Sequence, residues 1–226
     1  MTIPAAPPAP RPPATRERAA FGEHAVSIET YPGAGKERGA TPTILLLHDA
    51  NGVGPQVEVQ ALNLADAGFR VVLPHYLDRT RQARAGFSEI ARNFDLWRET
   101  VAAVLADAVS RTENTRVALV GRSLGGALAL AAARDAEGVA AVAVLSAFLP
   151  PSLADRPLRL PPVLALHGGR DAIVQPSHAA ALETGILRAG GACEVVLYPD
   201  QAHAFDAAAE SDAGARTLDF LRRHLP

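Results

Sequence analysis

The sequence predicts an α/β fold with a doubly wound, mostly parallel sheet and helices on both faces. Short runs made almost wholly of apolar residues recur along the chain, as in strands that are buried on both faces of a sheet. Segments with apolar residues at three- and four-residue spacing, typical of amphipathic helices, lie between these runs. Strands that alternate with helices indicate a parallel sheet covered by those helices.

The strands and helices can be assigned in chain order. A weak alternation from His24 to Tyr31 predicts an edge strand or part of a hairpin, and the segment 33–39 predicts a turn. Buried strands are predicted at 43–47, 70–73, 117–120, 139–145, 162–166 and 194–198. Helices are predicted at 57–67, 90–108, 127–133, 177–189 and 212–224. Trp97 shares the apolar stripe of its helix, so we expect it in the core.

The composition is that of an ordinary globular protein. The chain has 226 residues, of which 48% are hydrophobic and 20% charged, so one domain is the simplest organisation. The N-terminal segment is rich in proline, alanine and arginine and shows no periodicity. We therefore expect a disordered tail at 1–18, followed by a single domain at 19–226.

Charge and cysteine content argue against several functions. The net charge of −2 disfavours nucleic-acid binding, which usually requires a basic excess. The single cysteine, Cys193, excludes an intrachain disulfide. No apolar run reaches the roughly 18 residues that a membrane span needs. Because the N-terminus also lacks the apolar segment of a signal peptide, we expect a cytoplasmic protein that binds neither nucleic acid nor membrane.

One motif lies where a predicted strand meets a predicted helix. Gly121-Arg122-Ser123-Leu124-Gly125 has the pattern G-x-S-x-G, in which a serine occupies a sharp turn. Glycines on both sides of the serine allow the backbone segments to come close together. The helix that follows directs the positive end of its dipole toward the serine. An ordinary capping serine at a tight turn has the same pattern, so a catalytic interpretation needs partner residues.

Two later strand ends carry the partners that such a serine needs. A serine hydroxyl becomes a strong nucleophile only when a base takes its proton, and a third group must orient that base. Asp171 follows the strand at 162–166, and His203 follows the strand at 194–198. The order Ser…Asp…His is that of α/β hydrolases. We therefore expect Ser123 as nucleophile, His203 as base and Asp171 as the orienting acid.

Other histidines and acids compete for these roles. His178 and His224 lie within predicted helices, and His167 is too close to the candidate acid in sequence to pair with it in this manner. Asp200 and Asp206 are loop acids that could compete with Asp171, but Asp171 has the strand-end position behind two glycines. No pair of histidines has the spacing of a zinc site, so we expect neither a metal nor a cofactor.

The reaction also needs donors for the negative charge that develops on the carbonyl oxygen of the substrate. We expect one donor to be the backbone N–H of Leu124, directly after the serine, and the other to be that of Ala50 in the loop after the strand at 43–47. Losing one such donor typically costs about 3 kcal/mol in the transition state, so this loop matters nearly as much as the three side chains.

Five segments together resemble the dienelactone hydrolase family of α/β hydrolases, from about residue 24 onward. They are Leu47-His48-Asp49-Ala50-Asn51-Gly52-Val53, Val72-Leu73-Pro74-His75-Tyr76, Val120-Gly121-Arg122-Ser123-Leu124-Gly125-Gly126-Ala127, Leu166-His167-Gly168-Gly169-Arg170-Asp171 and Ala202-His203-Ala204-Phe205. The resemblance implies the α/β-hydrolase fold without a large cap domain, and the hydrolysis of esters or lactones.

Three departures from the family pattern bear on the substrate. The founding dienelactone hydrolases have a cysteine where this chain has Ser123. The family usually has a glutamate where Asp49 stands, so the acid here is shorter by one methylene. Two arginines hold the substrate carboxylate in the founding enzymes. Arg79 or Arg81 could match the first of them, and the second, expected near Ala207, is missing. Asp49, Arg79 and Arg81 are thus candidate substrate contacts.

The sequence predicts a serine hydrolase that cleaves a small carboxylic ester or lactone through an acyl-enzyme, without a cofactor. Two alternatives remain open, namely a ligand-binding protein that lacks activity on the same scaffold, and an acyltransferase or peptidase that uses the same residues. The absence of a large cap or propeller domain argues against an oligopeptidase. The arginines of the 79–84 loop either favour anionic esters or form a solvated surface loop.

Overall fold

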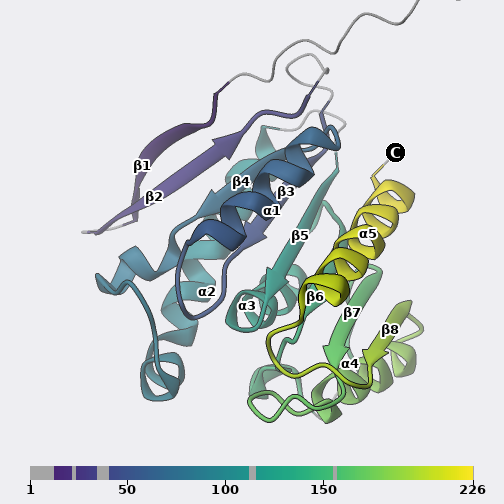
Figure 1. The fold of residues 1–226 in the computed structure, drawn as a ribbon. Helices are drawn as coiled ribbons and strands as arrows, with labels where there is room; N and C mark the ends of the chain where they lie inside the picture. The colour runs from purple at the N-terminus through teal and green to yellow at the C-terminus, as the bar shows by residue number, and fades with distance from the viewer. Residues whose placement is uncertain (1–12, 22–23, 35–40, 112–115, 155–156, 226) are drawn as a thin grey trace, which may run out of the picture.

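The sheet contains eight strands in the order β1-β2-β4-β3-β5-β6-β7-β8 (Figure 1). The computed structural model describes residues 13–21, 24–34, 41–111, 116–154 and 157–225. The strands from β3 to β8 run parallel to one another, whereas β2 is antiparallel to both β1 and β4. The predicted doubly wound, mostly parallel α/β sheet is confirmed.

Strands and helices alternate along the chain. The strands are β1 Thr15–Phe21, β2 His24–Tyr31, β3 Thr43–Leu47, β4 Arg70–Pro74, β5 Val117–Arg122, β6 Val139–Leu145, β7 Val163–Gly168 and β8 Cys193–Tyr198. The α-helices are α1 Pro55–Asp66, α2 Phe87–Ser110, α3 Leu124–Arg134, α4 Ser177–Arg188 and α5 Ala207–His224, and short 3-10 helices are η1 Tyr76–Thr80 and η2 Pro151–Leu153. In the described ranges, no helix combines the length and apolar character needed to cross a membrane.

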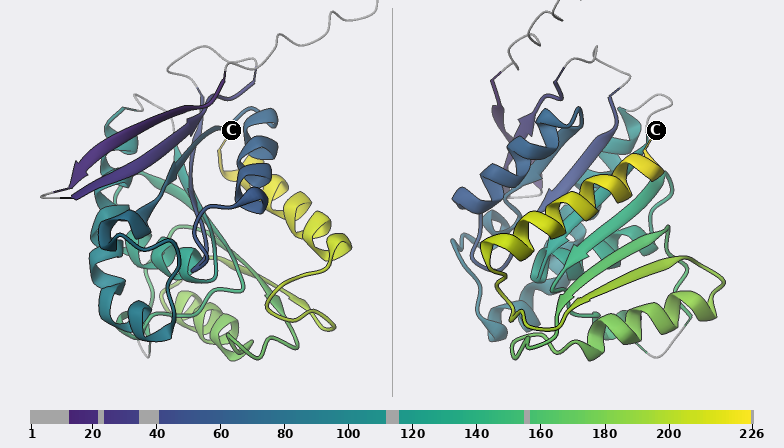
Figure 2. Two further views of the ribbon diagram at one scale, coloured as in Figure 1. Left: turned by 60° about the vertical axis from the view of Figure 1, so that its left-hand side comes forward. Right: turned by 45° about the vertical axis from the view of Figure 1, so that its right-hand side comes forward.

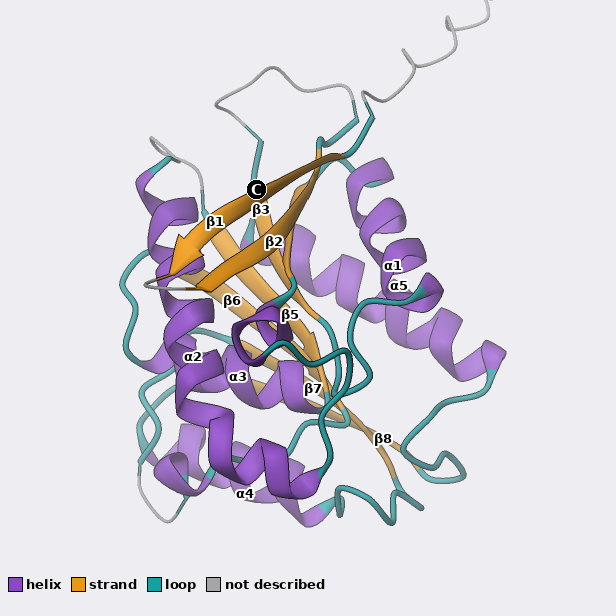
Figure 3. Cartoon of the chain, turned by 90° about the vertical axis from the view of Figure 1, so that its left-hand side faces the viewer, coloured by secondary structure: helices purple, strands orange, loops and turns teal. Residues whose placement is uncertain are grey.

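Helices cover both faces of the sheet. Helices α1 and α5 lie on one face, and α2, α3 and α4 lie on the other (Figure 3). Helix α5 runs diagonally across its face (Figure 2). Successive side chains of β3 divide between the two layers, because Ile44 and Leu46 pack on the α1 and α5 side and Leu45 and Leu47 pack on the other. A strand that is buried on both faces needs an apolar residue at every position, which explains the continuous apolar runs in the sequence.

The N-terminal edge of the sheet differs from the expectation. Residues 15–18, which we expected to belong to the tail, form the first part of β1 and pair with β2. Most side chains of β1 are exposed at the sheet edge, so no apolar pattern marks the strand. Strand β2 belongs to a hairpin, one of the two expected arrangements, and lies inside the edge strand β1. The N-terminal segment 1–12 and most of the predicted turn at 33–39 lie outside the described residues.

Helix α5 starts earlier than the apolar pattern predicts. The predicted start is residue 212, whereas the helix begins at Ala207. Asp206 caps it, because the carboxylate of Asp206 accepts a hydrogen bond from the N–H of Ala209 at 2.9 Å. Such a cap satisfies an amide that has no partner inside the helix. The first turn therefore depends on its cap and on alanine-rich composition, which leave no apolar periodicity to detect.

The parallel strands bring several loops to one edge of the sheet. Strands β3, β5, β7 and β8 run in the same direction, so their carboxyl ends and the loops that follow lie together. In open α/β sheets ligands bind outside this edge. The residues that follow these four strands are therefore the ones that can form a common site.

We predict that Trp97→Ala lowers the free energy of unfolding by about 3–5 kcal/mol. The Trp97 side chain is fully buried between α2 and the sheet, and its Nε1–H donates to Thr80 Oγ1 at 3.2 Å. Urea unfolding measures the change. Phe87→Ala is the matched control, because Phe87 begins the same helix but is 77% exposed. Similar losses in the two variants would contradict the assignment of Trp97 to the core.

Candidate active site

Ser123 lies at a strained bend between β5 and α3. Its backbone has φ 50° and ψ −116°, a conformation that residues other than glycine rarely adopt. The bend is held on both sides, because the N–H of Ser123 donates to the carbonyl of Leu145 at 2.9 Å and its carbonyl accepts from Ala127 at 3.0 Å. Ser123 occupies the N-cap position, but its hydroxyl makes no capping hydrogen bond. The hydroxyl oxygen instead lies 3.1 Å from His203 Nε2.

The glycines of the motif allow α3 to approach the ends of the neighbouring strands. A Cβ atom on Gly125 would collide with the backbone carbonyls of Leu47 and His48, at the end of β3. A Cβ atom on Gly121 would collide with the carbonyl of Gly125. A larger residue would push α3 away from β3 at position 125 and away from β5 at position 121. The glycines therefore bring the start of α3 next to the loop that follows β3.

The structure brings Ser123, His203 and Asp171 into one continuous chain of hydrogen bonds. His203 Nε2 lies 3.1 Å from Ser123 Oγ, and His203 Nδ1 lies 2.7 Å from Asp171 Oδ2. The second carboxylate oxygen, Asp171 Oδ1, accepts from the backbone N–H groups of Ile173 at 2.9 Å and Val174 at 2.8 Å. The Asp171 side chain is fully buried and that of His203 is mostly buried. Both oxygens of the Asp171 carboxylate are thus held by hydrogen-bond donors.

His167 supports the loop that carries Asp171. Its Nε2 lies 2.9 Å from the carbonyl oxygen of Val174, which accepts the N–H, and 3.5 Å from Asp171 Oδ2. Because the backbone N–H of Val174 binds Asp171 Oδ1, both polar groups of Val174 hold this loop closed. His167 therefore contacts the acid without occupying the place of the base.

The other competing residues are engaged elsewhere. Asp200 pairs with Arg170 at 2.6 Å, and Asp206 caps α5. The Nδ1 atom of His178 accepts a hydrogen bond from the N–H of Leu149 at 3.2 Å. In the part of the chain that the structure describes, none of these side chains forms a hydrogen bond with the side chain of Ser123, His203 or Asp171.

The two expected oxyanion donors lie on loops that meet at the start of α3. Leu124 is the first residue of α3, so its N–H has no acceptor inside the helix. Ala50 lies in the loop after β3, and its carbonyl accepts from the N–H of Ala85 at 2.8 Å. Among the described residues, no protein acceptor takes the N–H of Ala50 or of Leu124. Both amides therefore remain available to a ligand.

The candidate substrate contacts Asp49, Arg79 and Arg81 do not join the three central side chains, those of Ser123, His203 and Asp171. Asp49 Oδ1 accepts from the backbone N–H of Asn51 at 2.7 Å, so this carboxylate stabilises its own turn. Arg79 donates to the carbonyl of Phe21 at 2.6 Å and ties the β1–β2 hairpin to η1. Arg81 is exposed at a left-handed turn. Within the described ranges, neither arginine forms a hydrogen bond with Ser123, His203 or Asp171.

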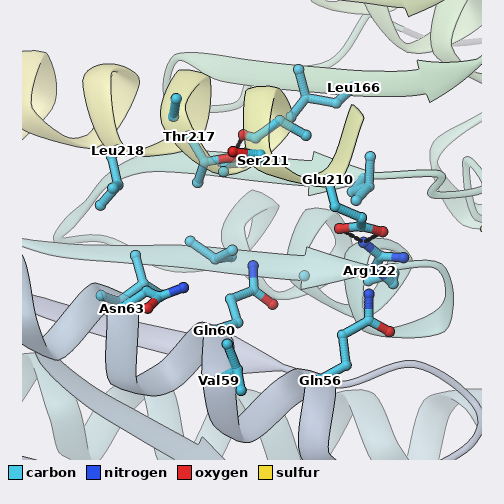
Figure 4. Close-up of a pocket in the computed structure, with 18 of the residues that line it drawn as sticks. Gln56, Val59, Gln60, Asn63, Arg122, Leu166, Glu210, Ser211, Thr217 and Leu218 are labelled. Carbon is cyan, nitrogen blue, oxygen red and sulfur yellow. Dashed lines mark hydrogen bonds and ion pairs between the residues drawn. The ribbon is translucent and has the colours of Figure 1, made fainter. Parts of the chain in front are cut away.

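A groove of about 720 Å³ lies between α1 and α5 (Figure 4). Its floor is apolar and comes from β5, β6 and β7, and α1 contributes Gln56, Gln60 and Asn63 to its wall. At one end Arg122 forms an ion pair with Glu210, which ties the motif strand to α5. The described residues that line the groove include none of the three central side chains, so it is separate from the site at Ser123.

His48 and Tyr76 are two buried polar residues that were not among the predicted site residues. Their rings stack at a centroid distance of 4.0 Å with an interplanar angle of 9°. His48 directly follows β3 and Tyr76 begins η1, so the pair joins the loops after β3 and β4. Burial lowers the pKa of His48 from 6.5 to about 4 and raises that of Tyr76. In the sequence, His48 is marked as a polar residue directly after an apolar strand, and both residues lie in segments that resemble the family.

Cys193 does not belong to the site. It is partly buried at the start of β8 and packs against the core on the α2, α3 and α4 side. Burial, with smaller contributions from Glu183 and Glu194, raises the pKa of its thiol to about 12. A thiol with so high a pKa is a poor nucleophile near neutral pH. Cys193 therefore does not replace the cysteine of the founding dienelactone hydrolases.

We predict that His48 makes the protein less stable below about pH 6.5. The unfolded chain binds a proton on His48 at that pH, whereas the folded protein binds it only near pH 4, so stability falls as the pH drops through this window. By pH 4.5 the loss is about 2–3 kcal/mol. Urea unfolding at pH 7 and pH 4.5 measures it. His48→Asn should show a smaller loss between the two values, and equal losses would contradict the prediction.

Comparisons with known proteins show which family the chain is similar to. The model of the dienelactone hydrolase family matches residues 28–225. A Yersinia pestis protein named "Putative carboxymethylenebutenolidase" is 27% identical over 213 residues, which cover 82% of this chain and 79% of that protein.

Two solved structures show the same fold. The dienelactone hydrolase-like promiscuous phosphotriesterase P91, from metagenomic libraries, has a TM-score of 0.81 and 21% identity, covering 95% of this chain and 99% of its own. Thermogutta terrifontis esterase 2, phosphorylated by paraoxon, has a TM-score of 0.68 and 18% identity, covering 95% of both chains. The family match, over most of the chain, confirms the resemblance in the sequence. The chain belongs to the dienelactone hydrolase family and is a carboxylic ester hydrolase with the α/β-hydrolase fold.

Proposed function

We propose that Ser123, His203 and Asp171 form a catalytic triad that hydrolyses a small carboxylic ester or lactone through an acyl-enzyme. The observation that carries this proposal is the unbroken hydrogen-bonded chain from Ser123 Oγ through the His203 ring to the buried Asp171 carboxylate. This arrangement contains a nucleophile, a base within reach of its proton and a group that orients the base.

In acylation, the proton of Ser123 moves along this hydrogen-bonded chain to His203. Ser123 Oγ forms a bond to the carbonyl carbon while its proton passes to His203 Nε2, and the carbonyl π electrons move to the oxygen. The N–H groups of Ala50 and Leu124 stabilise that oxyanion. The intermediate then collapses, the bond to the alcohol oxygen breaks, and His203 returns the proton to the leaving alcohol. Asp171 accepts the Nδ1–H bond of His203 throughout and stabilises the transient imidazolium.

Deacylation repeats these steps with water. His203 takes a proton from a water molecule whose oxygen attacks the acyl carbon, and the same two amides hold the second oxyanion. The ester bond to Ser123 breaks and Ser123 recovers its proton from His203, leaving a carboxylic acid. With a lactone, acid and alcohol are parts of one product. Nothing is oxidised or reduced in either half of the reaction.

We propose a general ester or lactone rather than dienelactone itself as the substrate. Ser123 replaces the nucleophilic cysteine of the founding enzymes, and the sequence around Ala207 lacks the second arginine that holds the carboxylate in those enzymes. Of the two candidates for the first carboxylate-binding arginine, Arg79 already donates to the carbonyl of Phe21, and Arg81 is exposed. These features support a substrate that is held mainly by its reacting carbonyl group.

We predict that Ser123→Ala lowers kcat about a million-fold, by analogy with other serine triads. The assay uses a panel of short and long acyl esters and lactones, with and without a carboxylate. Ser177→Ala is the matched control, because Ser177 is an exposed serine at the start of α4. The wild-type protein should hydrolyse one class of these substrates faster than the others. The control variant should have the same kcat as the wild type. Undiminished hydrolysis by Ser123→Ala would overturn the proposed function.

A further inference from the structure

The Asp49–Ala50 peptide is the part of the proposed oxyanion hole that the backbone alone does not hold. Helix α3 sets the direction of the Leu124 N–H, whereas the Ala50 N–H belongs to a loop. A peptide unit is planar, so its C=O and N–H groups point in opposite directions. Whatever holds the carbonyl of Asp49 therefore also sets the direction of the Ala50 N–H.

Two buried side chains hold that carbonyl. His48 Nδ1 lies 2.7 Å from the carbonyl oxygen of Asp49, which can only accept, so the ring carries its proton on Nδ1. The hydroxyl of Tyr76 donates to the carbonyl of His48 at 2.6 Å and also lies 3.4 Å from the carbonyl of Asp49. His48 is 2% exposed and Tyr76 is fully buried. Two successive carbonyls of the loop thus bind side-chain donors inside the protein.

The two rings also pack against each other. The rings stack nearly parallel at 4.0 Å, and Tyr76 also packs near Trp97 of α2. The low pKa of His48 keeps the ring neutral near pH 7, with one donor nitrogen. The same loop is held from its outer side, because Ala85 donates to the carbonyl of Ala50 and Asn51 donates to the Asp49 side chain. The Ala50 N–H is left as the unused polar group of this peptide among the described contacts.

We infer that His48 and Tyr76 are positioning residues that aim the Ala50 N–H at the oxyanion. The inference rests on the proposed function, since the oxyanion forms only if Ser123 attacks a carbonyl. Neither residue touches the substrate. Their effect is electrostatic preorganisation, because a donor that is already aimed needs no rearrangement when the charge develops.

The test compares four variants with the wild-type protein. Tyr76→Phe removes the hydroxyl, and His48→Leu removes the donor nitrogen. His48→Asn keeps an N–H near the position of Nδ1 and should rescue most of the activity. Tyr31→Phe is the control, because the Tyr31 hydroxyl donates to Glu29 at 2.7 Å, on the α1 side of the sheet. Thermal unfolding and circular dichroism establish that each variant is folded.

We expect kcat for p-nitrophenyl acetate to fall about 10- to 100-fold in Tyr76→Phe and His48→Leu, which is less than complete loss of a donor. The KM should change less than about twofold, because the donor acts mainly on the transition state. An aliphatic trifluoromethyl ketone forms a hemiketal oxyanion with an active serine, so its inhibition constant should rise in parallel with the loss of kcat. Tyr31→Phe should match the wild type.

The possible outcomes separate this inference from the proposed function. If Ser123→Ala retains the full activity, the proposed function fails and the inference fails with it. If Ser123→Ala is inactive but Tyr76→Phe and His48→Leu keep the wild-type kcat, only the inference is overturned. A loss of kcat without weaker binding of the ketone also overturns it. Should Tyr76→Phe fail to fold, the comparison of His48→Leu with His48→Asn decides, and equal losses in those two variants count against the inference.

Discussion

The backbone bend at Ser123 is the constraint on which the rest of the site depends. Its positive φ turns the chain from β5 into α3 within one residue. Strain of this kind persists only where the surroundings impose it. Here β6 holds the amide of Ser123, and Gly125 lets α3 lie against the end of β3. The same contact that stabilises the bend therefore brings the start of α3 next to the loop that contains Ala50.

Buried polar groups fix the remaining parts of the site. The Asp171 carboxylate is held by two backbone amides and by His203, and His167 closes the loop around it. His48 and Tyr76 hold the loop after β3 in a similar way. Each group satisfies a polar atom that would be costly to bury alone. The site thus consists of strand-end loops that internal hydrogen bonds make rigid.

The sequence predicts the parts of this arrangement that follow from strand order. Ser123, Asp171 and His203 each follow a strand of a parallel sheet, so their common edge can be predicted without coordinates. Strand β1 cannot be found in this way, because an exposed edge strand needs no apolar pattern. The bond from Arg79 to Phe21 and the stack of His48 on Tyr76 join residues far apart in the sequence. Only the packed structure shows that Arg79 is already engaged and that the pair holds a loop.

The central claim is that the fold activates Ser123 through His203. Its most direct test is mass-spectrometric peptide mapping after reaction with a fluorophosphonate, which phosphonylates an activated serine. We expect one adduct, on the peptide that contains Ser123, and little or no adduct when His203 is replaced by alanine. An adduct on another serine, such as the buried Ser146, or undiminished labelling in His203→Ala, would contradict the claim.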